Sequence, residues 1–271
     1  MTIEKPPSIK KKTSFRIVDW TNENQGQKTL IYGVSGIGKT SLAALVKNAA
    51  FIGTDDGGRL FEDAEGNAKL KHVPDITDFA GVRLALQSNI WKPGMTVVID
   101  NITELERWAL PHLFKTMPKS QGGGVIKNIE DYGFHKGYRY WYDTMLLILG
   151  DCSELIRRGV NVVMVAQSTI CKSVQAGTED FVKEGPALHH DKNVSTMNAY
   201  VEWADHVLRL ANCSVTVSKE GKAGGESDSR AVYVHPQPHF HAKSRTIGKE
   251  FDVVSFEDVN DNSIWRLIFG E

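Results

Sequence analysis

Apolar positions along the chain form two patterns, namely short unbroken runs and longer segments in which apolar residues recur every three or four positions. Unbroken runs predict strands buried on both faces of a parallel sheet. They lie at 28–32, 50–52, 96–99 and 160–166. The three-to-four periodicity predicts helices, the second of which can be capped by Thr77 or Asp78. They are expected at 39–48, 77–88, 103–112 and 138–157. This alternation predicts an α/β domain with a mostly parallel sheet covered by helices.

The pattern changes in the second half of the chain. Residues 117–137 are glycine-rich and residues 168–198 are polar, so both are expected to be irregular connections. Three short strand patterns and a terminal helix follow, and they predict a C-terminal antiparallel β extension. They lie at 206–210, 214–217, 231–235 and 263–269. We expect three parts, namely a basic tail and possible tether at 1–27, a core of alternating strands and helices at 28–212, and the extension with its helix at 213–271.

Composition and charge narrow the possible classes. The 271 residues carry 32 Lys and Arg against 33 Asp and Glu, so the chain is nearly neutral. A surface that binds nucleic acid would therefore have to be a basic patch on one part of the protein. Three widely spaced cysteines without a C-x-x-C pair argue against a disulfide framework and a cysteine-rich zinc site. The apolar runs are too short to span a bilayer, and the N-terminus lacks a secretory apolar region. We therefore expect a cytoplasmic protein without a membrane partner.

Residues 33–40 read GVSGIGKT and match the phosphate-loop pattern G-x-x-x-x-G-K-[ST] between a predicted strand and a predicted helix. The glycines let backbone N–H groups approach phosphate oxygens, Lys39 can reach the β- and γ-phosphates, and the Thr40 hydroxyl can bind Mg²⁺. The motif predicts a nucleoside triphosphate site. Its residues are Gly33, Val34, Ser35, Gly36, Ile37, Gly38, Lys39, Thr40 and Ser41.

Polar residues end three of the predicted strands, where ligands bind in open α/β sheets. Asp100 closes the strand TVVID and is expected to bind Mg²⁺. Asp55 and Asp56 follow the second strand, and either could orient the attacking water, although D-D-G-G also suits an ordinary turn. Gln167 ends the fourth strand and could contact the γ-phosphate.

Taken in order, these segments resemble the RecA-like P-loop ATPases. They resemble more closely the compact phage-type ATP-binding proteins of that group, some of which act in single-strand annealing or recombination. The resemblance covers most of residues 28–248. It is carried by IYGVSGIGKTSLAA, AAFIGTDDGG, TVVIDNITEL, NVVMVAQS and HAKSRTIG. It implies a RecA-like P-loop NTPase core that binds ATP and Mg²⁺, in the host cytoplasm if the protein is encoded by a phage.

The resemblance also implies roles for single residues. The water-activating residue of the family falls on Asp55 or, with a shift of one residue, on Asp56. Glutamate is usual at this position in the family. The aspartate side chain is shorter and reaches less far toward the water, which affects the expected rate of hydrolysis. Gln167 matches the glutamine that links the γ-phosphate to a DNA-binding loop, and Lys243 and Arg245 match basic residues that reach the nucleotide of a neighbouring protomer.

In a RecA-like core, the two irregular connections would contact DNA. Residues 113–140 have a local excess of positive charge and interleaved aromatic residues, a combination typical of single-strand binding. Tyr138, Tyr140 and Trp141 could instead pack the following helix onto the sheet. The candidate DNA contacts are Lys115, Lys119, Lys127, Lys136, Arg139 and, in the second connection, Lys172.

The expected function is ATP binding and hydrolysis coupled to single-stranded DNA binding, in phage-type recombination or single-strand annealing. The resemblance favours a homo-oligomer, ring or filament, with ATP between protomers, and leaves a phage or host single-strand-binding protein open as a partner. A non-catalytic ATP-binding assembly factor is one alternative. A small-molecule kinase is another, although an arginine-rich lid is missing. A GTPase is disfavoured because the chain lacks N-K-x-D.

Overall fold

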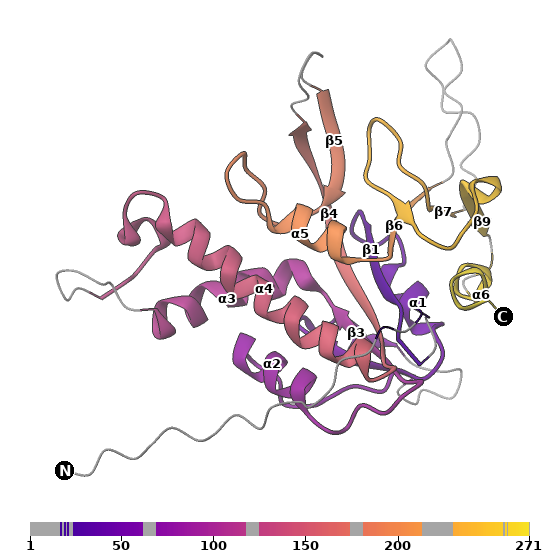
Figure 1. The fold of residues 1–271 in the computed structure, drawn as a ribbon, viewed down its shortest axis with the longest axis horizontal. Helices are drawn as coiled ribbons and strands as arrows, with labels where there is room; N and C mark the ends of the chain where they lie inside the picture. Colours follow the sequence, from indigo (N-terminus) through magenta and orange to yellow (C-terminus); the bar gives the residue numbers. More distant parts are fainter. Residues whose placement is uncertain are drawn as a thin grey trace.

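A mixed β-sheet forms the centre of the protein (Figure 1). The computed structural model describes residues 24–61, 69–117, 125–173, 181–212, 230–256 and 260–270, with positions 17, 19, 21 and 258. In that part of the chain the strand order is β2-β3-β4-β1-β6-β7-β9, with β5 paired to β4 and β8 to β6. The strands are β1 (Lys28–Gly33), β2 (Ala49–Gly53), β3 (Thr96–Asp100), β4 (Asn161–Ser173), β5 (Phe181–Pro186), β6 (His206–Asn212), β7 (Arg230–Tyr233), β8 (Lys243–Ser244) and β9 (Val253–Phe256).

Parallel pairing of β2, β3, β4, β1 and β6 brings the carboxyl ends of these strands to one edge of the sheet. In this register Gly33 lies beside Gln167, and Asp100 lies beside Gly53 and Val165. Residues at that edge come from distant parts of the sequence, so the pairing assembles a site that no single segment contains.

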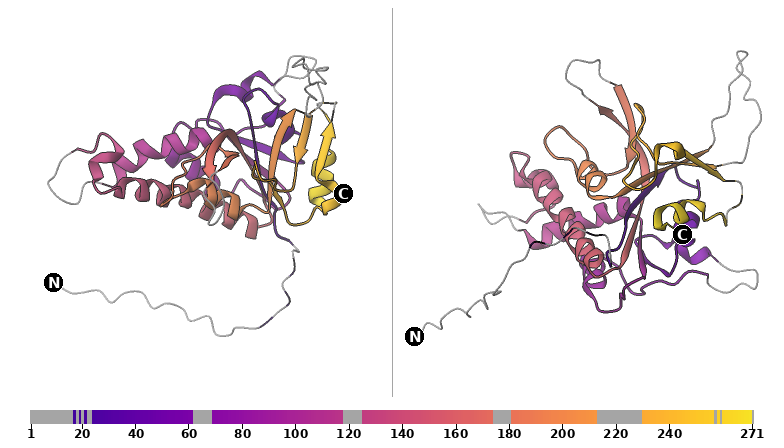
Figure 2. Two further views of the ribbon diagram at one scale, coloured as in Figure 1. Left: turned by 90° about the horizontal axis from the view of Figure 1, so that it is seen from above. Right: turned by 45° about the vertical axis from the view of Figure 1, so that its right-hand side comes forward.

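Helices cover both faces of the sheet (Figures 1 and 2). The core on one face includes side chains from α2, α3, α4 and α5, and the core on the other includes side chains from α1 and α6. Trp265 of α6 donates a hydrogen bond to the Leu42 carbonyl of α1 at 2.8 Å. The helices are α1 (Lys39–Ala44), α2 (Phe79–Gln87), α3 (Ile102–Thr116), α4 (Lys136–Arg157), α5 (Thr196–Trp203) and α6 (Ser263–Phe269), with short 3₁₀ turns η1 (Asp56–Leu60), η2 (Ile129–Tyr132) and η3 (Lys249–Phe251).

The expected fold class is confirmed, because the sheet is mostly parallel, is covered by helices, and continues into the antiparallel strands β7 and β9. None of the helices in the described part of the chain is both long and apolar enough to cross a membrane.

Three local expectations are wrong. Residues 168–198 are not an irregular connection, because β4 continues to Ser173 and pairs with β5, and α5 follows. This β4–β5 hairpin extends beyond the sheet, as Figure 2 shows. Because its strands are exposed there, their sequence has no continuous apolar run of the kind that predicts a buried strand. Strand β6, expected to be antiparallel, pairs in parallel with β1. Helix α1 ends at Ala44 rather than near residue 48. The expected strand at 214–217 lies outside the described residues.

Glu106 is a buried carboxyl group that joins α3 to the segment before α5. Its two oxygens accept the backbone N–H of His189 at 2.9 and 3.1 Å. Burial raises the pKa of Glu106 from 4.5 to about 7, although hydrogen bonds from His189 and Thr196 oppose the shift. The folded state therefore binds this proton more tightly than the unfolded state, and the free energy of unfolding should fall as the pH rises between these two values.

Glu106→Gln is expected to remove this pH dependence, because an amide keeps a similar shape without the ionisation. The wild-type contribution amounts to about 3 kcal/mol between pH 4.5 and 7. Urea unfolding of both proteins at pH 5 and pH 7.5 measures it. An equal loss of stability in both proteins over this range would show that Glu106 is not the group that titrates.

Candidate nucleotide site

The segment from Gly33 to Ser41 connects β1 to α1 at the carboxyl edge of the sheet, as the sequence predicts for a phosphate loop. Gly36 and Gly38 have φ angles of 78° and 101°, a region that glycine adopts without strain. Val34 and Ser35 are exposed, whereas Ile37 is buried and anchors the loop on the core shared with α1. The loop is therefore held in place by Ile37, while its residues 34–36 are exposed to solvent.

Lys39 lies under this loop with only 7% of its surface exposed. Its Nζ donates hydrogen bonds to the carbonyl oxygens of Gly33 at 2.9 Å and Val34 at 2.8 Å, and to Oε1 of Gln167 at 3.0 Å. Burial lowers the pKa of Lys39, and the negative charges of Asp100 and Asp55 partly oppose the shift. A buried ammonium group is thus held at the loop, where phosphate oxygens could replace some of its present acceptors.

Asp100 and Thr40 form a pair of oxygen donors beside the loop. The Thr40 hydroxyl donates to Oδ2 of Asp100 at 2.6 Å, and Asp100 is 8% exposed. Burial raises the pKa of Asp100 to about 6, the negative charge of Asp55 adds to this rise, and Thr40 and Lys39 oppose it. A metal ion would favour the ionised carboxylate.

The Thr40 and Asp100 oxygens suit Mg²⁺, which binds through one or two protein oxygens and keeps its remaining positions for water and phosphate. Within the described residues, no group of three or more His, Cys, Asp and Glu side chains could hold a metal ion. With two protein oxygens, the Thr40–Asp100 pair fits a magnesium ion that arrives with a nucleotide.

Asp55 follows β2, the strand next to β3. In the sheet, β2 lies on the side of β3 that faces away from β1 and its phosphate loop. Its carboxylate accepts hydrogen bonds from Asn101 Nδ2 at 2.7 Å and from the Gly57 N–H at 3.0 Å. Asn101 also caps α3 by accepting the Glu104 N–H at 2.8 Å, so the α3 N-terminus orients Asp55. Asp56 begins η1, and its side chain lies outside the described part of the structure. The water-activating role of either residue stays a prediction.

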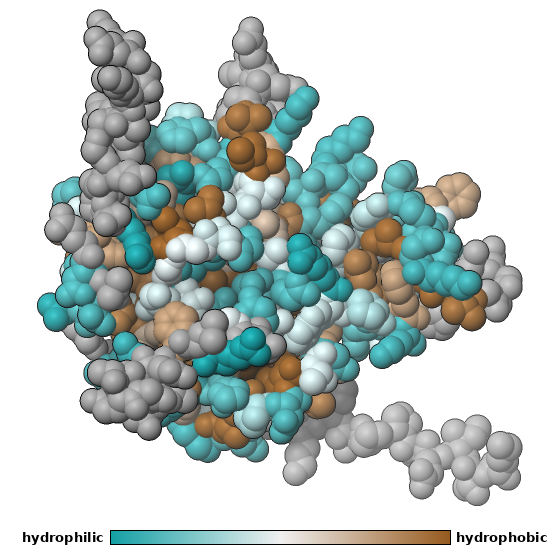
Figure 3. All heavy atoms as spheres, turned by 180° about the vertical axis from the view of Figure 1, so that it is seen from behind, coloured by the Kyte–Doolittle hydropathy of each residue, from teal (hydrophilic) through white to brown (hydrophobic). Residues whose placement is uncertain are grey.

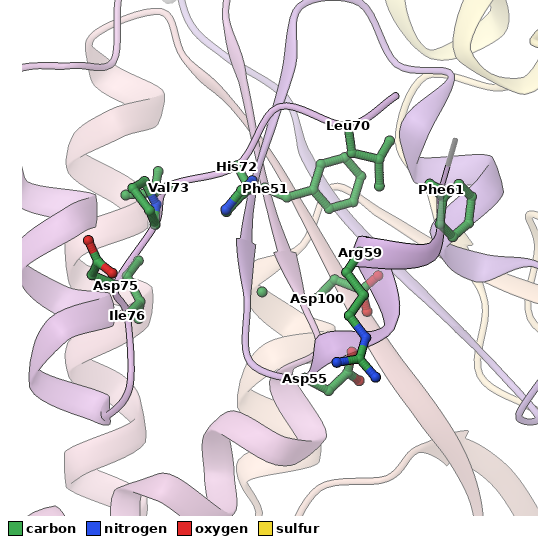
Figure 4. Close-up of a pocket in the computed structure, with 13 residues that line it drawn as sticks. Phe51, Asp55, Arg59, Phe61, Leu70, His72, Val73, Asp75, Ile76 and Asp100 are labelled. Atoms are coloured by element: carbon green, nitrogen blue, oxygen red, sulfur yellow. The ribbon is translucent and has the colours of Figure 1, made fainter. Parts of the chain in front are cut away.

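A cavity of about 490 Å³ opens beside these carboxylates (Figure 4). Asp55, Asp100 and Arg59 line one side, and Leu70, His72 and Val73 line another. Residues 69–76 reach this position because the Phe51 N–H donates to Lys71 at 2.8 Å and the Val73 N–H donates to Phe51 at 2.8 Å. The sequence analysis missed this wall, since the segment has no strand pattern and is held by contacts to the edge strand β2.

Gln167 lies at the same edge, as expected, and its backbone N–H donates to the Thr103 hydroxyl at 3.1 Å. Lys243 and Arg245 lie at the opposite end of the strands, beside the start of β6. Lys243 Nζ donates to the carbonyls at the end of α5, including that of Val201 at 3.1 Å, and Arg245 pairs with Asp205 at 3.0 Å. The structure does not bring either to the phosphate loop of its own chain, and their role toward a neighbouring protomer stays a prediction.

The candidate DNA-contacting residues fall into two separate regions. One region is the end of α3, η2 and the start of α4, and the other is the β4–β5 hairpin, where Lys172 is exposed. The candidates of the first region that the structure describes are all exposed, namely Lys115, Lys127, Lys136 and Arg139, while Lys119 lies outside the described residues. Arg139 also pairs with Asp143 at 3.1 Å.

The aromatic residues of the first region divide into packed and exposed rings. Tyr138 stacks on His189 with 5.3 Å between ring centroids, and Trp141 donates to the Glu106 carbonyl at 2.9 Å. Phe134 is 96% exposed. Tyr138 and Trp141 therefore have structural partners, and Phe134 is the ring that this region offers to solvent.

The geometry of the loop, Lys39 and Asp100 defines the chain as a P-loop nucleotide-binding protein. Comparison with family models then identifies the family, because residues 25–246 match the model described as AAA domain. The match spans most of the chain, which therefore belongs to the AAA domain family.

Comparisons with individual proteins show weaker similarity than the family model does. Among solved structures, the chain is similar to the RadB recombinase, at 15% sequence identity and a TM-score of 0.42, with 77% of this chain and 80% of that chain covered. No curated protein matches the sequence significantly.

Proposed function

We propose that this protein hydrolyses ATP and binds single-stranded DNA in recombination or single-strand annealing of the phage type. The observation that carries the proposal is the 3.0 Å hydrogen bond from Lys39 Nζ to Oε1 of Gln167. It connects the phosphate loop to the strand from which the β4–β5 hairpin extends. An ATP-dependent change at Lys39 can therefore reach the hairpin through a single side chain.

Gln167 is also part of the base of this hairpin. Its carbonyl accepts the N–H of Ala187 at 2.7 Å, directly after β5, so Gln167 connects both sides of the hairpin base. Beyond it, Lys172 is exposed, and Ile170 and Val182 are 71% and 58% exposed. Apolar surface on the hairpin is visible in the view from behind (Figure 3). A cation beside exposed apolar side chains suits contact with the phosphates and bases of a single strand.

Nucleotide binding would compete with the present hydrogen bonds of Lys39. Lys39 would turn part of its donors toward the β- and γ-phosphates, and Gln167 would exchange the ammonium for a new partner. A side chain that has two alternative partners can shift the hairpin between two arrangements. Thr40 and Asp100 would hold Mg²⁺, which neutralises charge that develops on the phosphates. Asp55, oriented by Asn101, would accept a proton from the attacking water.

The proposal extends to assembly. We expect a homo-oligomer, ring or filament, in which Lys243 or Arg245 of one protomer approaches the nucleotide of the next. The Arg245 side chain is 59% exposed beside Asp205 and is accessible to a neighbour, whereas Lys243 would have to leave the carbonyls at the end of α5. A phage or host single-strand-binding protein is a further proposed partner.

Fluorescence anisotropy with a labelled single-stranded oligonucleotide tests the coupling. For the wild type, a non-hydrolysable ATP analogue should tighten DNA binding by about tenfold or more, the size of a typical coupling free energy. Gln167→Ala should abolish this effect while retaining analogue binding. Gln87→Ala, an exposed glutamine on α2, is the matched control and should behave as the wild type. DNA affinity that is unaffected by the analogue would contradict the proposal, as would full coupling in Gln167→Ala.

A further inference from the structure

We propose that Arg230 is a phosphate-binding residue that completes the nucleotide site within one chain. Its guanidinium group would bind the phosphate chain of a nucleotide held by the loop Gly33–Ser41, from the side of β7. The inference rests on the proposed nucleotide site and adds to it a residue that belongs to none of the sequence motifs.

Sheet topology places Arg230 at the correct edge. Strand β6 runs parallel to β1, and its end lies against the start of the loop, since a Cβ on Gly33 would lie 2.4 Å from the Leu210 carbonyl oxygen. Strand β7 runs antiparallel to β6 and begins with Arg230, which is opposite Asn212. The first residue of β7 therefore lies at the same edge as the carboxyl ends of the parallel strands.

The Arg230 side chain reaches the loop itself. A Cβ placed on Gly38 would lie 2.3 Å from Nη1 of Arg230 and 3.4 Å from its Cζ. The guanidinium group therefore lies directly against the backbone of Gly38, whose φ of 101° favours glycine. Gly38 directly precedes Lys39, so two cationic side chains approach the same turn from different elements, Lys39 from α1 and Arg230 from β7.

In the part of the chain that the structure describes, the N–H donors of Arg230 have no acceptors. Arg230 is half-buried, and among the described residues it makes no hydrogen bond or ion pair. Two other half-buried arginines are paired, Arg83 with Asp151 at 2.7 Å and Arg209 with Glu184 at 2.7 Å. A guanidinium group carries five N–H donors in a planar fork that matches phosphate oxygens. A di- or triphosphate in the loop would supply the missing acceptors.

Calorimetric titration of the full chain with ATP and with inorganic tripolyphosphate tests this role. Arg230→Ala should weaken the binding of both ligands by about 10- to 100-fold, as expected for the loss of hydrogen bonds to a charged group. Arg230→Lys should recover part of the affinity, because it keeps the charge without the fork. Arg157→Ala is the matched control, since Arg157 is exposed and is the last residue of α4, at the opposite edge of the sheet.

Three further results decide the inference. Added salt should weaken binding to the wild type more than binding to Arg230→Ala, because one cation is missing in the variant. If Arg230→Ala does not fold by circular dichroism, Arg230→Gln, which keeps much of the side chain, should show the loss. If the wild type binds ATP and both Arg230→Ala and Arg230→Gln bind it within about twofold of the wild type, the inference is wrong. Failure of the wild type to bind either ligand would overturn the nucleotide site itself.

Discussion

Alanine in place of Lys39 is expected to lower kcat for ATP hydrolysis by about 100- to 1000-fold. This is the usual effect of removing one hydrogen-bond donor that stabilises the charge developing in a transition state. Lys39 is the buried cation of the loop, and its Nζ lies within hydrogen-bond distance of Gly33, Val34 and Gln167. The variant would lose both the positive charge on the phosphates and the contact that connects the loop to β4. Phosphate release under multiple turnover measures the effect, and it also distinguishes an ATPase from a non-catalytic ATP-binding assembly factor.

Lys92→Ala is the control for this variant. Lys92 is exposed, and its Nζ donates to the Asn89 carbonyl at 2.8 Å, before β3 and away from the loop. We expect wild-type kcat for Lys92→Ala and a native circular dichroism spectrum for both variants. A Lys39→Ala protein that is folded and hydrolyses ATP at the wild-type rate would remove the loop from the reaction.

Asparagine in place of Asp100 is expected to abolish the effect of Mg²⁺ on ATP affinity and to lower kcat by about 100-fold, since a catalytic metal ion supplies several kcal/mol. ATP binding without Mg²⁺ should persist, because the loop and Lys39 are unchanged. Burial raises the pKa of wild-type Asp100 to about 6, so a proton competes with Mg²⁺ below that pH. The Mg²⁺ effect in the wild type should therefore weaken as the pH falls below about 6.

The measurement is ATP affinity with and without Mg²⁺ at pH 5 and pH 7.5, for the wild type, Asp100→Asn and Asp75→Asn. Asp75 is an exposed carboxylate that lines the same cavity without belonging to the Thr40–Asp100 pair. Its φ of 61° suits asparagine as well as aspartate. Asp75→Asn should keep the wild-type response. A full Mg²⁺ effect in Asp100→Asn would place the metal elsewhere.

The parts of the site that were predicted from the sequence are those that a short segment determines. The loop from Gly33 to Ser41 has its conformation because Gly36 and Gly38 take positive φ angles, and this requirement is visible as glycine spacing. Asp100 was found because a carboxylate at the end of an unbroken apolar run is expected at the ligand-binding edge. The expected site at Gly33, Asp100 and Gln167 rested on parallel pairing, which the sheet has.

The parts that were missed depend on pairing between distant segments. The β4–β5 hairpin is exposed, so Ile170 and Val182 give no signal of burial. The wall at residues 69–76 forms through hydrogen bonds to Phe51. Arg230 reaches Gly38 because β7 is antiparallel to β6, and nothing in the local sequence around Arg230 indicates that contact.

The structure also limits one expectation drawn from the resemblance. Lys243 and Arg245 carry charges that suit a phosphate, yet both have partners within the chain at the edge opposite the loop. Their proposed role requires a second protomer and, for Lys243, the exchange of three carbonyl acceptors. Arg230 needs neither, which makes it the nearer source of a second positive charge for the phosphates.

Calorimetric titration of the full wild-type chain with ATP, in the presence and absence of Mg²⁺, tests most directly whether the loop and Asp100 form a nucleotide site. Because the chain has one phosphate loop, we predict one ATP per chain, with tighter binding when Mg²⁺ is present. Titration without detectable ATP binding in either condition would contradict the account, and binding that is indifferent to Mg²⁺ would contradict the role of Asp100.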